Sequence, residues 1–388
     1  MALLSWLFIV TALYLALVGW DNMRVYFRIA PPPDTSRKKW PLVSVCVPAR
    51  DEAHRIVPCL EGFLRQSYPN YEVLVTDDQS TDDTWKVLKR YAAKDRRIKP
   101  VKGKPMPKGW VGKSWACHQA VLKARGEWVL FTDADTWHEV DSLKRTVQTA
   151  EARSADLLSC MTGQATETWM EKLVIPVLCF NLISLFPIRW ILRKGSPFAK
   201  VVWVNGQFLL FRRKALQAIG GHPTIKGRID EDFSLARRMI AQGYKVDLFN
   251  GTDLVTCRMY SSAYDVWFGL SRNIFPSFDF SVPKALAGYL ATMAITVLPF
   301  VLPFLTHPGS LLFGSSLALA IALVLLRLNQ AVQFRFHLPS CFLHGLGSFI
   351  FLAIGFNSMR WYVVHGHGHW KGRLMVQKDL QAKSAYMA

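Results

Sequence analysis

The chain has 388 residues, of which 51% are apolar, and a formal net charge of +19. Its seven scattered cysteines contain no C-x-x-C pair, which excludes a zinc knuckle and a disulfide framework. The apolar residues gather at both ends, so composition indicates a membrane protein with one aqueous domain. The basic residues flank the apolar segments and form no basic–aromatic patch, which favours anionic lipid headgroups over nucleic acid as their partner. These flanking residues are Arg24, Arg28, Arg37, Lys38, Lys39, Arg189, Arg193 and Lys194.

Residues 1–22 are apolar enough to form one transmembrane helix. No basic residue precedes this helix and no small-residue cleavage site follows it, so an anchor fits better than a cleaved signal peptide. The basic, proline-containing stretch 23–40 is predicted to be a linker. By the positive-inside rule it places the following domain in the cytoplasm.

Residues 41–280 are predicted to form the catalytic domain, because apolar runs alternate with helical patterns there. Such alternation predicts a parallel sheet covered by helices on both faces. The expected strands are 42–47, 71–76, 98–101 and 128–132. The expected helices are 52–66, 81–93 with Ser80 as the cap, and 114–124.

Two further stretches are apolar. Residues 173–195 contain prolines and are predicted to be an interfacial amphipathic segment, because a spanning helix there would separate the acidic motifs across the membrane. Residues 281–363 contain three hydrophobic segments, and residues 364–388 form a basic tail. If all three segments span, this tail lies outside, which the positive-inside rule disfavours; one of them being re-entrant is the alternative.

Acidic residues follow three of the predicted strands. In an open parallel sheet, ligands bind beyond the carboxyl ends of the strands, and all three segments deliver carboxylates to that edge. Each acid alone could be a turn residue or a helix cap. Their convergence favours a ligand site. The segments are 48–52, Asp77–Asp78 and Asp133–Asp135.

Asp133 and Asp135 form a D-x-D pair directly after an apolar strand. Mg²⁺ and Mn²⁺ prefer oxygen ligands and often take only one or two carboxylates, with substrate phosphates completing the shell. The pair therefore predicts a divalent cation bridging a diphosphate. Lys113 lies near a predicted helix start and could contact the donor, although P-loop spacing is missing and a solvated lysine is the alternative.

Six motifs in order resemble family-2 glycosyltransferases of the GT-A fold. They are VSVCVPARDEA (43–53), VLVTDDQSTD (73–82), GWVGKSWACHQA (109–120), LFTDADT (130–136), NGQFLLFRRKALQAIGGH (205–222) and DEDFSLARRM (230–239). The resemblance covers roughly residues 40–275 and implies an α/β mixed sheet flanked by helices, here between transmembrane segments at the two ends. Within the family, CRMYSSAYDVWFGLSRN (257–273) and HWKGR (369–373) are most similar to the bacterial carotenoid (diaponeurosporenoate) branch, which lies close to hopanoid-associated enzymes.

The resemblance also implies roles for single residues. Asp232 matches the catalytic base and Glu231 its acidic neighbour; helix capping is the alternative for Asp232. Asp135 would ligate the metal with support from Asp133, and Asp78 would hydrogen-bond the uracil ring. The remaining donor-binding positions are Pro48, Asp51, Glu52, Asp77, Lys113, Asn205, Gly206 and Arg272. Many relatives have Asn at position 51 and Gly at position 79, where this chain has Asp51 and Gln79.

Together these observations predict an inverting enzyme of the bacterial inner membrane. It would move one sugar, with glucose from UDP-glucose as the first choice, to a lipid acceptor such as a carotenoid acid or hopanoid. The Q-x-x-R-W motif of processive synthases is absent, which disfavours the alternative of a polysaccharide synthase with an export channel. Diacylglycerol and polyprenyl phosphate remain alternative acceptors, and a non-catalytic scaffold is the remaining alternative for the whole chain.

Overall fold

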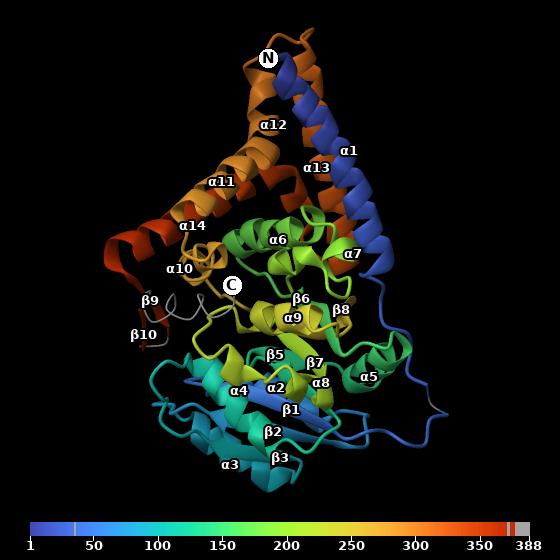
Figure 1. Ribbon diagram of the computed structural model, residues 1–388, viewed down its shortest axis with the longest axis vertical. Coiled ribbons are helices and arrows are strands. Elements are labelled where there is room, and N and C mark those ends of the chain that lie inside the picture. Colours follow the sequence, from blue (N-terminus) through green and yellow to red (C-terminus); the bar gives the residue numbers. More distant parts are fainter. Residues whose placement is uncertain (35, 371–372, 377–388) are drawn as a thin grey trace. The chain divides into compact units, whose positions relative to one another are not determined.

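The computed structural model describes residues 1–34, 36–370 and 373–376, so most of the expected basic tail 364–388 lies outside the described residues (Figure 1). The chain forms two compact units. The sheet unit comprises Tyr26–Ala165 and Ile188–Met259. The helical unit comprises Met1–Val25, Thr166–Pro187 and the chain from Tyr260 onward. The stretches 166–187 and 260–280, expected within the catalytic domain, thus group with the apolar helices.

The sheet unit is built on one eight-stranded sheet with the order β3-β2-β1-β4-β7-β6-β8-β5. Its strands are β1 (Val43–Ala49), β2 (Tyr71–Asp77), β3 (Ile98–Lys102), β4 (Trp128–Thr132), β5 (Thr136–His138), β6 (Leu157–Gln164), β7 (Phe208–Arg212) and β8 (Val246–Cys257). β1, β2, β3 and β4 are parallel, whereas β7 runs antiparallel to both β4 and β6. The sheet is therefore mixed, and the predicted α/β fold class is confirmed.

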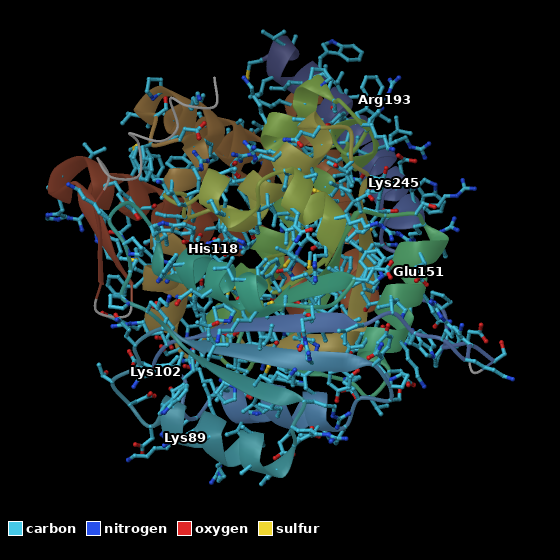
Figure 2. All side chains as sticks on the ribbon, turned by 60° about the horizontal axis from the view of Figure 1, so that its bottom comes forward. Lys89, Lys102, His118, Glu151, Arg193 and Lys245 are labelled. Carbon is cyan, nitrogen blue, oxygen red and sulfur yellow. The ribbon has the colours of Figure 1, made fainter. Side chains whose placement is uncertain are left out.

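Helices flank this sheet, with an apolar core of buried strand residues between the layers (Figure 1). The longer ones are α2 (Ile56–Leu64), α3 (Thr84–Lys94), α4 (Gly112–Lys123), α5 (Ser142–Ala152), α8 (Arg213–Ala218) and α9 (Glu231–Ala241). Short helical turns lie at α7 (Ile188–Ile191), η1 (Pro197–Val201) and η2 (His222–Thr224). The linker before β1 packs on this unit, since Arg37 forms an ion pair with Glu151 of α5; Glu151 is labelled in Figure 2.

Two helix starts differ from the sequence prediction. α2 begins at Ile56 instead of residue 52, and α3 begins at Thr84, so Ser80 does not cap it. The intervening residues bond to one another instead: the Asp51 carboxylate accepts from the Thr81 amide at 2.7 Å, and the Ser80 hydroxyl accepts from the Asp51 amide at 3.0 Å. Polar side chains of this kind offer the backbone alternatives to helical hydrogen bonds. Both helices therefore begin at a later residue than predicted.

The helical unit contains four helical segments long and apolar enough to cross a membrane: Ala2–Val25, Val282–Phe304, Leu311–Phe334 and Leu338–His365. They comprise α1 (Ala2–Val25), α11 (Val282–Thr292), the π-turn η4 (Met293–Val297), α12 (Leu298–Val301), η5 (Leu302–Phe304), α13 (Leu311–Phe334), η6 (Leu338–Leu343) and α14 (His344–His365). α10 (Ala263–Ser271), η3 (Pro276–Phe278) and the hairpin β9 (His367–Trp370) and β10 (Arg373–Val376) complete the described part.

α6 (Trp169–Ser184) lies among these apolar helices and is buried along most of its length (Figure 1). Thr168 and Glu171 form a capping box at its start, which satisfies two amides that the helix leaves unpaired. It contacts α1, α10, α13 and α14. Close approach to α14 is possible because Gly347 has no Cβ; an added Cβ would lie 2.8 Å from the carbonyl oxygen of Leu173. The expected interfacial placement of 173–195 stays a prediction.

Candidate active site

The carboxyl ends of β1, β2 and β4 lie side by side, as the sequence predicts for a ligand edge. Pro48 belongs to the end of β1, and Asp77 ends β2. The amide of Asp78 donates to the carbonyl of Ala49 at 2.8 Å, so both strands stay joined beyond the sheet. Asp77 and Asp78 are both buried, and the Asp77 carboxylate accepts from the amide of Ser80 at 3.2 Å.

The loops after β1 and β2 each contain one residue in an unusual backbone conformation. Asp51 has a φ of 50° and Gln79 a φ of 57°, both in the left-handed region. Asp and Asn tolerate this region better than most residues, and glycine tolerates it best. The Asn and Gly that the family resemblance implies at positions 51 and 79 are residue types suited to this geometry. Glu52 follows and lies close enough to Asp135 for their charges to interact.

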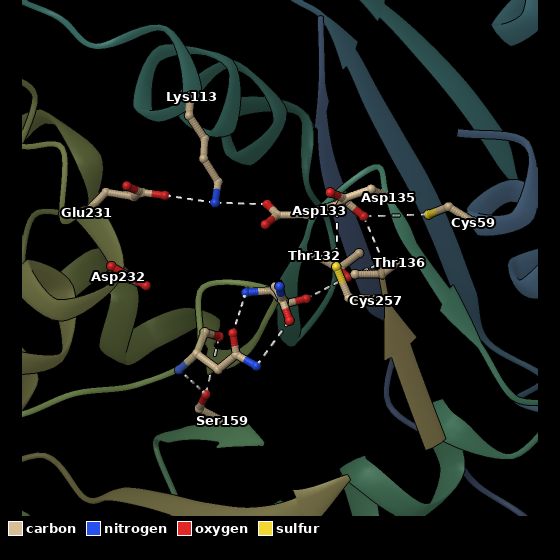
Figure 3. Close-up of polar contacts among 12 residues, drawn as sticks. Cys59, Lys113, Thr132, Asp133, Asp135, Thr136, Ser159, Glu231, Asp232 and Cys257 are labelled. Carbon is tan, nitrogen blue, oxygen red and sulfur yellow. Dashed lines mark hydrogen bonds and ion pairs between the residues drawn. The ribbon is translucent and has the colours of Figure 1, made fainter. Parts of the chain in front are cut away.

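Lys113 lies between two motifs that are far apart in the sequence (Figure 3). Its ammonium is 2.8 Å from the Asp133 carboxylate, after β4, and 3.0 Å from the Glu231 carboxylate, at the start of α9. Although burial opposes it, the charges of Asp133, Glu231 and Asp232 raise the pKa of Lys113 well above its usual value. Lys113 is therefore a permanent cation at the centre of an acidic cluster.

Asp135 lies beside this cluster and accepts a hydrogen bond from the Cys257 thiol, with sulfur and oxygen 3.6 Å apart (Figure 3). Burial, together with the charges of Asp133 and Glu52, raises its pKa to about 7. A carboxyl with a raised pKa is difficult to ionise. A cation bound beside it would favour the ionised form. Asp133 and Asp135 thus offer the hard oxygens that Mg²⁺ or Mn²⁺ prefers. Within the described residues no group of three or more His, Cys, Asp or Glu could hold an ion.

Asp232 is the second residue of α9 and lies against Gly206. A Cβ at position 206 would be 2.6 Å from a carboxylate oxygen of Asp232, so only glycine leaves room there. The N-cap position belongs to Asp230, which corrects the capping alternative for Asp232. Burial and the neighbouring charge of Glu231 raise the pKa of Asp232 to about 8, while Lys113 opposes the shift. Such a carboxyl is matched to proton transfer near neutral pH.

The other predicted positions have different surroundings. The Asn205 amide donates to the carbonyl of Cys160 at 3.1 Å and to the hydroxyl of Thr162 at 3.0 Å, so this side chain fixes the turn that carries Gly206. Arg272 follows α10 and belongs to the helical unit. All the other predicted site residues belong to the sheet unit.

A small cavity joins part of this cluster. Its lining includes five of the predicted site residues and adds residues to which the sequence analysis assigned no role. The most polar addition is His222, which is buried and whose pKa burial lowers to about 3, so it stays neutral. It follows Gly220 and Gly221 in the sequence, and neither glycine indicates that a functional residue comes next. The lining comprises Pro48, Lys113, Cys117, Phe131, Thr132, Asp133, Gly206, Leu209, His222, Glu231 and Leu235.

Comparison with known proteins agrees with this geometry. Residues 44–220 match the family model described as Glycosyl transferase family 2. The chain is 26% identical over 341 residues to the 4,4'-diaponeurosporenoate glycosyltransferase of Staphylococcus aureus (strain USA300), covering 85% of this chain and 87% of that protein. Among solved structures, a mannosyltransferase from Pyrobaculum calidifontis in complex with GDP-Man and Mn²⁺ is similar with a TM-score of 0.54 and 19% identity. That similarity covers 92% of this chain and 98% of the other, and it shows a shared GT-A-like fold.

Proposed function

Because residues 44–220 match the model of glycosyl transferase family 2, we propose that the chain transfers one sugar from a nucleotide diphosphate to a lipid acceptor with inversion at the anomeric carbon. The proposal rests on one observation: two acidic motifs that are far apart in the sequence both form ion pairs with the same lysine. Lys113 bridges Asp133 and Glu231. The next residue, Asp232, lies against the turn before β7.

Asp232 is the proposed general base. It takes the proton of the acceptor hydroxyl, or orients an acceptor carboxylate, while the acceptor oxygen attacks the anomeric carbon. The bond from that carbon to the diphosphate oxygen breaks as the new glycosidic bond forms on the opposite face. A single displacement of this kind inverts the configuration. Lys113 is placed to neutralise charge on the departing diphosphate, and Glu231 holds Lys113 in position.

Asp133 and Asp135 are the proposed ligands of Mg²⁺ or Mn²⁺, which when bound supplies electrostatic stabilisation of the diphosphate. Pro48, Asp51, Glu52, Asp77 and Asp78 are proposed to line the nucleotide end of the site, beside the strand edge. Asn205 and Gly206 are proposed to lie on the sugar side. A contact of Arg272 with the diphosphate remains part of the proposal.

UDP-glucose is the proposed donor and a carotenoid acid or a related isoprenoid lipid the proposed acceptor. Support comes from the distant similarity to a carotenoid-acid glycosyltransferase and from four long apolar helices that suggest membrane association. We place the enzyme in the bacterial inner membrane, with the sheet unit in the cytoplasm, because basic residues follow α1.

The direct test uses full-length protein in detergent with UDP-glucose, Mn²⁺ and candidate lipids, followed by mass spectrometry of the lipid products. Asp232→Asn is expected to bind UDP and to lose transfer by about 10²–10⁴-fold, the usual contribution of a general base. Asp247→Asn is the matched control, since Asp247 is also a buried carboxyl with a raised pKa but pairs with Arg153 instead.

Full transfer by Asp232→Asn would remove the catalytic assignment. Long sugar polymers formed from donor alone would identify a polysaccharide synthase in place of a single-sugar enzyme. No UDP binding in the presence of Mg²⁺ or Mn²⁺ would point to a scaffold.

A further inference from the structure

The helical unit contains a buried arginine without a counter-charge. Arg327 lies on α13 with 0% of its surface exposed. One guanidinium nitrogen donates to the carbonyl oxygen of Pro176 at 2.6 Å. Its Nε and its second terminal nitrogen have no partner among the described residues. Arginine remains protonated in proteins, so this side chain brings a full positive charge into an apolar bundle.

Other buried polar groups lie around Arg327. His344 of α14 has 0% exposure, and neither ring nitrogen finds a partner within the part of the chain that the structure describes. Its ring packs on Phe180 at 4.7 Å, and Phe180 lies one turn of α6 beyond Pro176. The charge of Arg327 reaches His344. Arg327 and His344 therefore face the same short stretch of α6.

Two more side chains extend this polar cluster. Gln330, one turn after Arg327, donates to the Ser184 hydroxyl at 2.7 Å and leaves its carbonyl oxygen unpaired. Ser348, one turn after His344, has an unpaired buried hydroxyl in the described structure. Most buried polar groups in proteins are paired, and an unpaired set of this size indicates a missing partner such as an ion or a ligand.

The missing partner has to be negative. Residues 280–378 contain no Asp or Glu at all. A lone guanidinium at membrane depth costs several kcal/mol, and in membrane proteins such residues face a partner or mark a ligand site. Water could satisfy single nitrogens but would not neutralise the charge.

We propose that Arg327 and His344 form a binding site for the carboxylate or phosphate head of an anionic membrane lipid. A guanidinium presents paired donors that match either oxyanion, and a histidine N–H adds a third. The helical segments that carry Arg327 and His344 are long and apolar enough to cross a membrane, which favours a lipid as the source of the oxyanion. This site is independent of the glycosyltransferase proposal, since all its residues belong to the helical unit.

The test measures lipid bound to full-length protein in mild detergent. Native mass spectrometry of the purified protein is expected to show a retained anionic lipid at about one per chain. After delipidation, nanodiscs containing phosphatidylglycerol are expected to raise the melting temperature relative to nanodiscs of phosphatidylcholine alone. Arg327→Gln is expected to retain at least about tenfold less anionic lipid, as for loss of a charged hydrogen bond of 1.5–3 kcal/mol.

Two further variants keep the test decisive if Arg327→Gln fails to fold. His344→Phe preserves ring packing on Phe180 and is expected to fold and to bind less lipid. Arg360→Gln is the matched control, because Arg360 is an exposed arginine on α14 and removes the same charge from the surface. It is expected to behave like the unaltered protein.

Several results would overturn the proposal. Equal lipid retention by Arg327→Gln, His344→Phe and Arg360→Gln would show only surface attraction. A melting-temperature rise with inorganic phosphate alone that matches the nanodisc effect would assign the anion to a free phosphate and exclude the lipid. Absence of any anionic lipid on the purified protein, with no response to phosphatidylglycerol, would leave Arg327 as a helix-packing residue.

Discussion

At the scale of single residues, the properties of the site depend on short distances between oppositely charged groups. Lys113 is held by two carboxylates, and a third, Asp232, lies near enough to influence it. In a half-buried site such charges interact more strongly than in water. Changes of one side chain are therefore expected to alter the behaviour of its neighbours.

Gly206→Ala is expected to lower transfer by about 10²-fold, because an added methyl group would push the Asp232 carboxylate from its position and a shift of about 1 Å can cost that much. Single-turnover transfer with saturating UDP-glucose measures the effect. UDP affinity should change little. Unchanged turnover would mean that Asp232 does not need this position.

The pH dependence of kcat/KM tests the proposal that Asp232 is the general base. Burial raises the pKa of Asp232, the proposed base, to about 8, and a base acts when deprotonated, so the proposal predicts activity that rises with pH through about 8 instead of being flat above pH 6. Lys113 lowers that pKa, so Lys113→Met should move the rise to higher pH. Lys99→Met is the control, because Lys99 pairs with Glu72 on β2 and not with the cluster. A profile unmoved by Lys113→Met would contradict the coupling.

Asp135→Asn is expected to stabilise the metal-free protein at alkaline pH. The folded-state pKa of Asp135 is about 7 against an ordinary value of 3.8, so ionisation opposes folding progressively as pH rises from about 4 to 7. Asparagine cannot ionise and removes this penalty. Melting temperatures at pH 5 and pH 8.5, with divalent ions chelated, should show a larger gain at pH 8.5; equal differences at both values would refute the assignment.

At the scale of elements, local patterns predicted the strands well and the helix starts poorly. The strand 128–132 was predicted at its observed bounds, since a continuous apolar run between charged residues has few alternatives. α3 is predicted to start at residue 81 with Ser80 as its cap but begins at Thr84, because side-chain hydrogen bonds between two loops decide where it starts. Alternation of strands and helices predicts parallel strands and applies to β1, β2, β3 and β4. It gives no sign that β7 is antiparallel.

The same contrast holds for the site. Acids after strands converge through topology, so Asp77, Asp78 and Asp133 were predictable from position. Asp232 and Gly206 were chosen by family resemblance, and only the structure brings them into contact. His222 was missed because a single histidine after two glycines has no pattern.

Helix packing gives a test at this scale. Gly347→Val is expected to destabilise the protein by about 1–3 kcal/mol, the usual cost of overpacking, because any Cβ there meets the backbone of α6. Gly314→Val is the control, as no atom lies within 4 Å of a Cβ at that position. Melting in detergent measures both. Equal stability of the two variants would mean that α6 and α14 do not pack closely.

At the scale of the whole molecule, basic residues predict the orientation. The tail carries Lys371, Arg373, Lys378 and Lys383, so it is expected in the same compartment as the sheet unit. One C-terminal segment would then not span, and 282–304 is the candidate because π and 3₁₀ turns interrupt it. A topology reporter fused after residue 388 is expected to report the cytoplasm. A periplasmic signal, with an internal reporter after residue 28 as the cytoplasmic control, would show that all segments cross.

The helical unit is assembled from three stretches of chain, with α6 arising between two halves of the sheet unit. During synthesis, α6 leaves the ribosome long after α1 but well before α13 and α14, so its apolar surface must wait for two of its partners. For the same reason, cutting away both ends would not release a soluble enzyme. Residues 26–259 alone would keep α6 without any of its helical neighbours in this unit and would be expected to aggregate unless detergent or a membrane covered it.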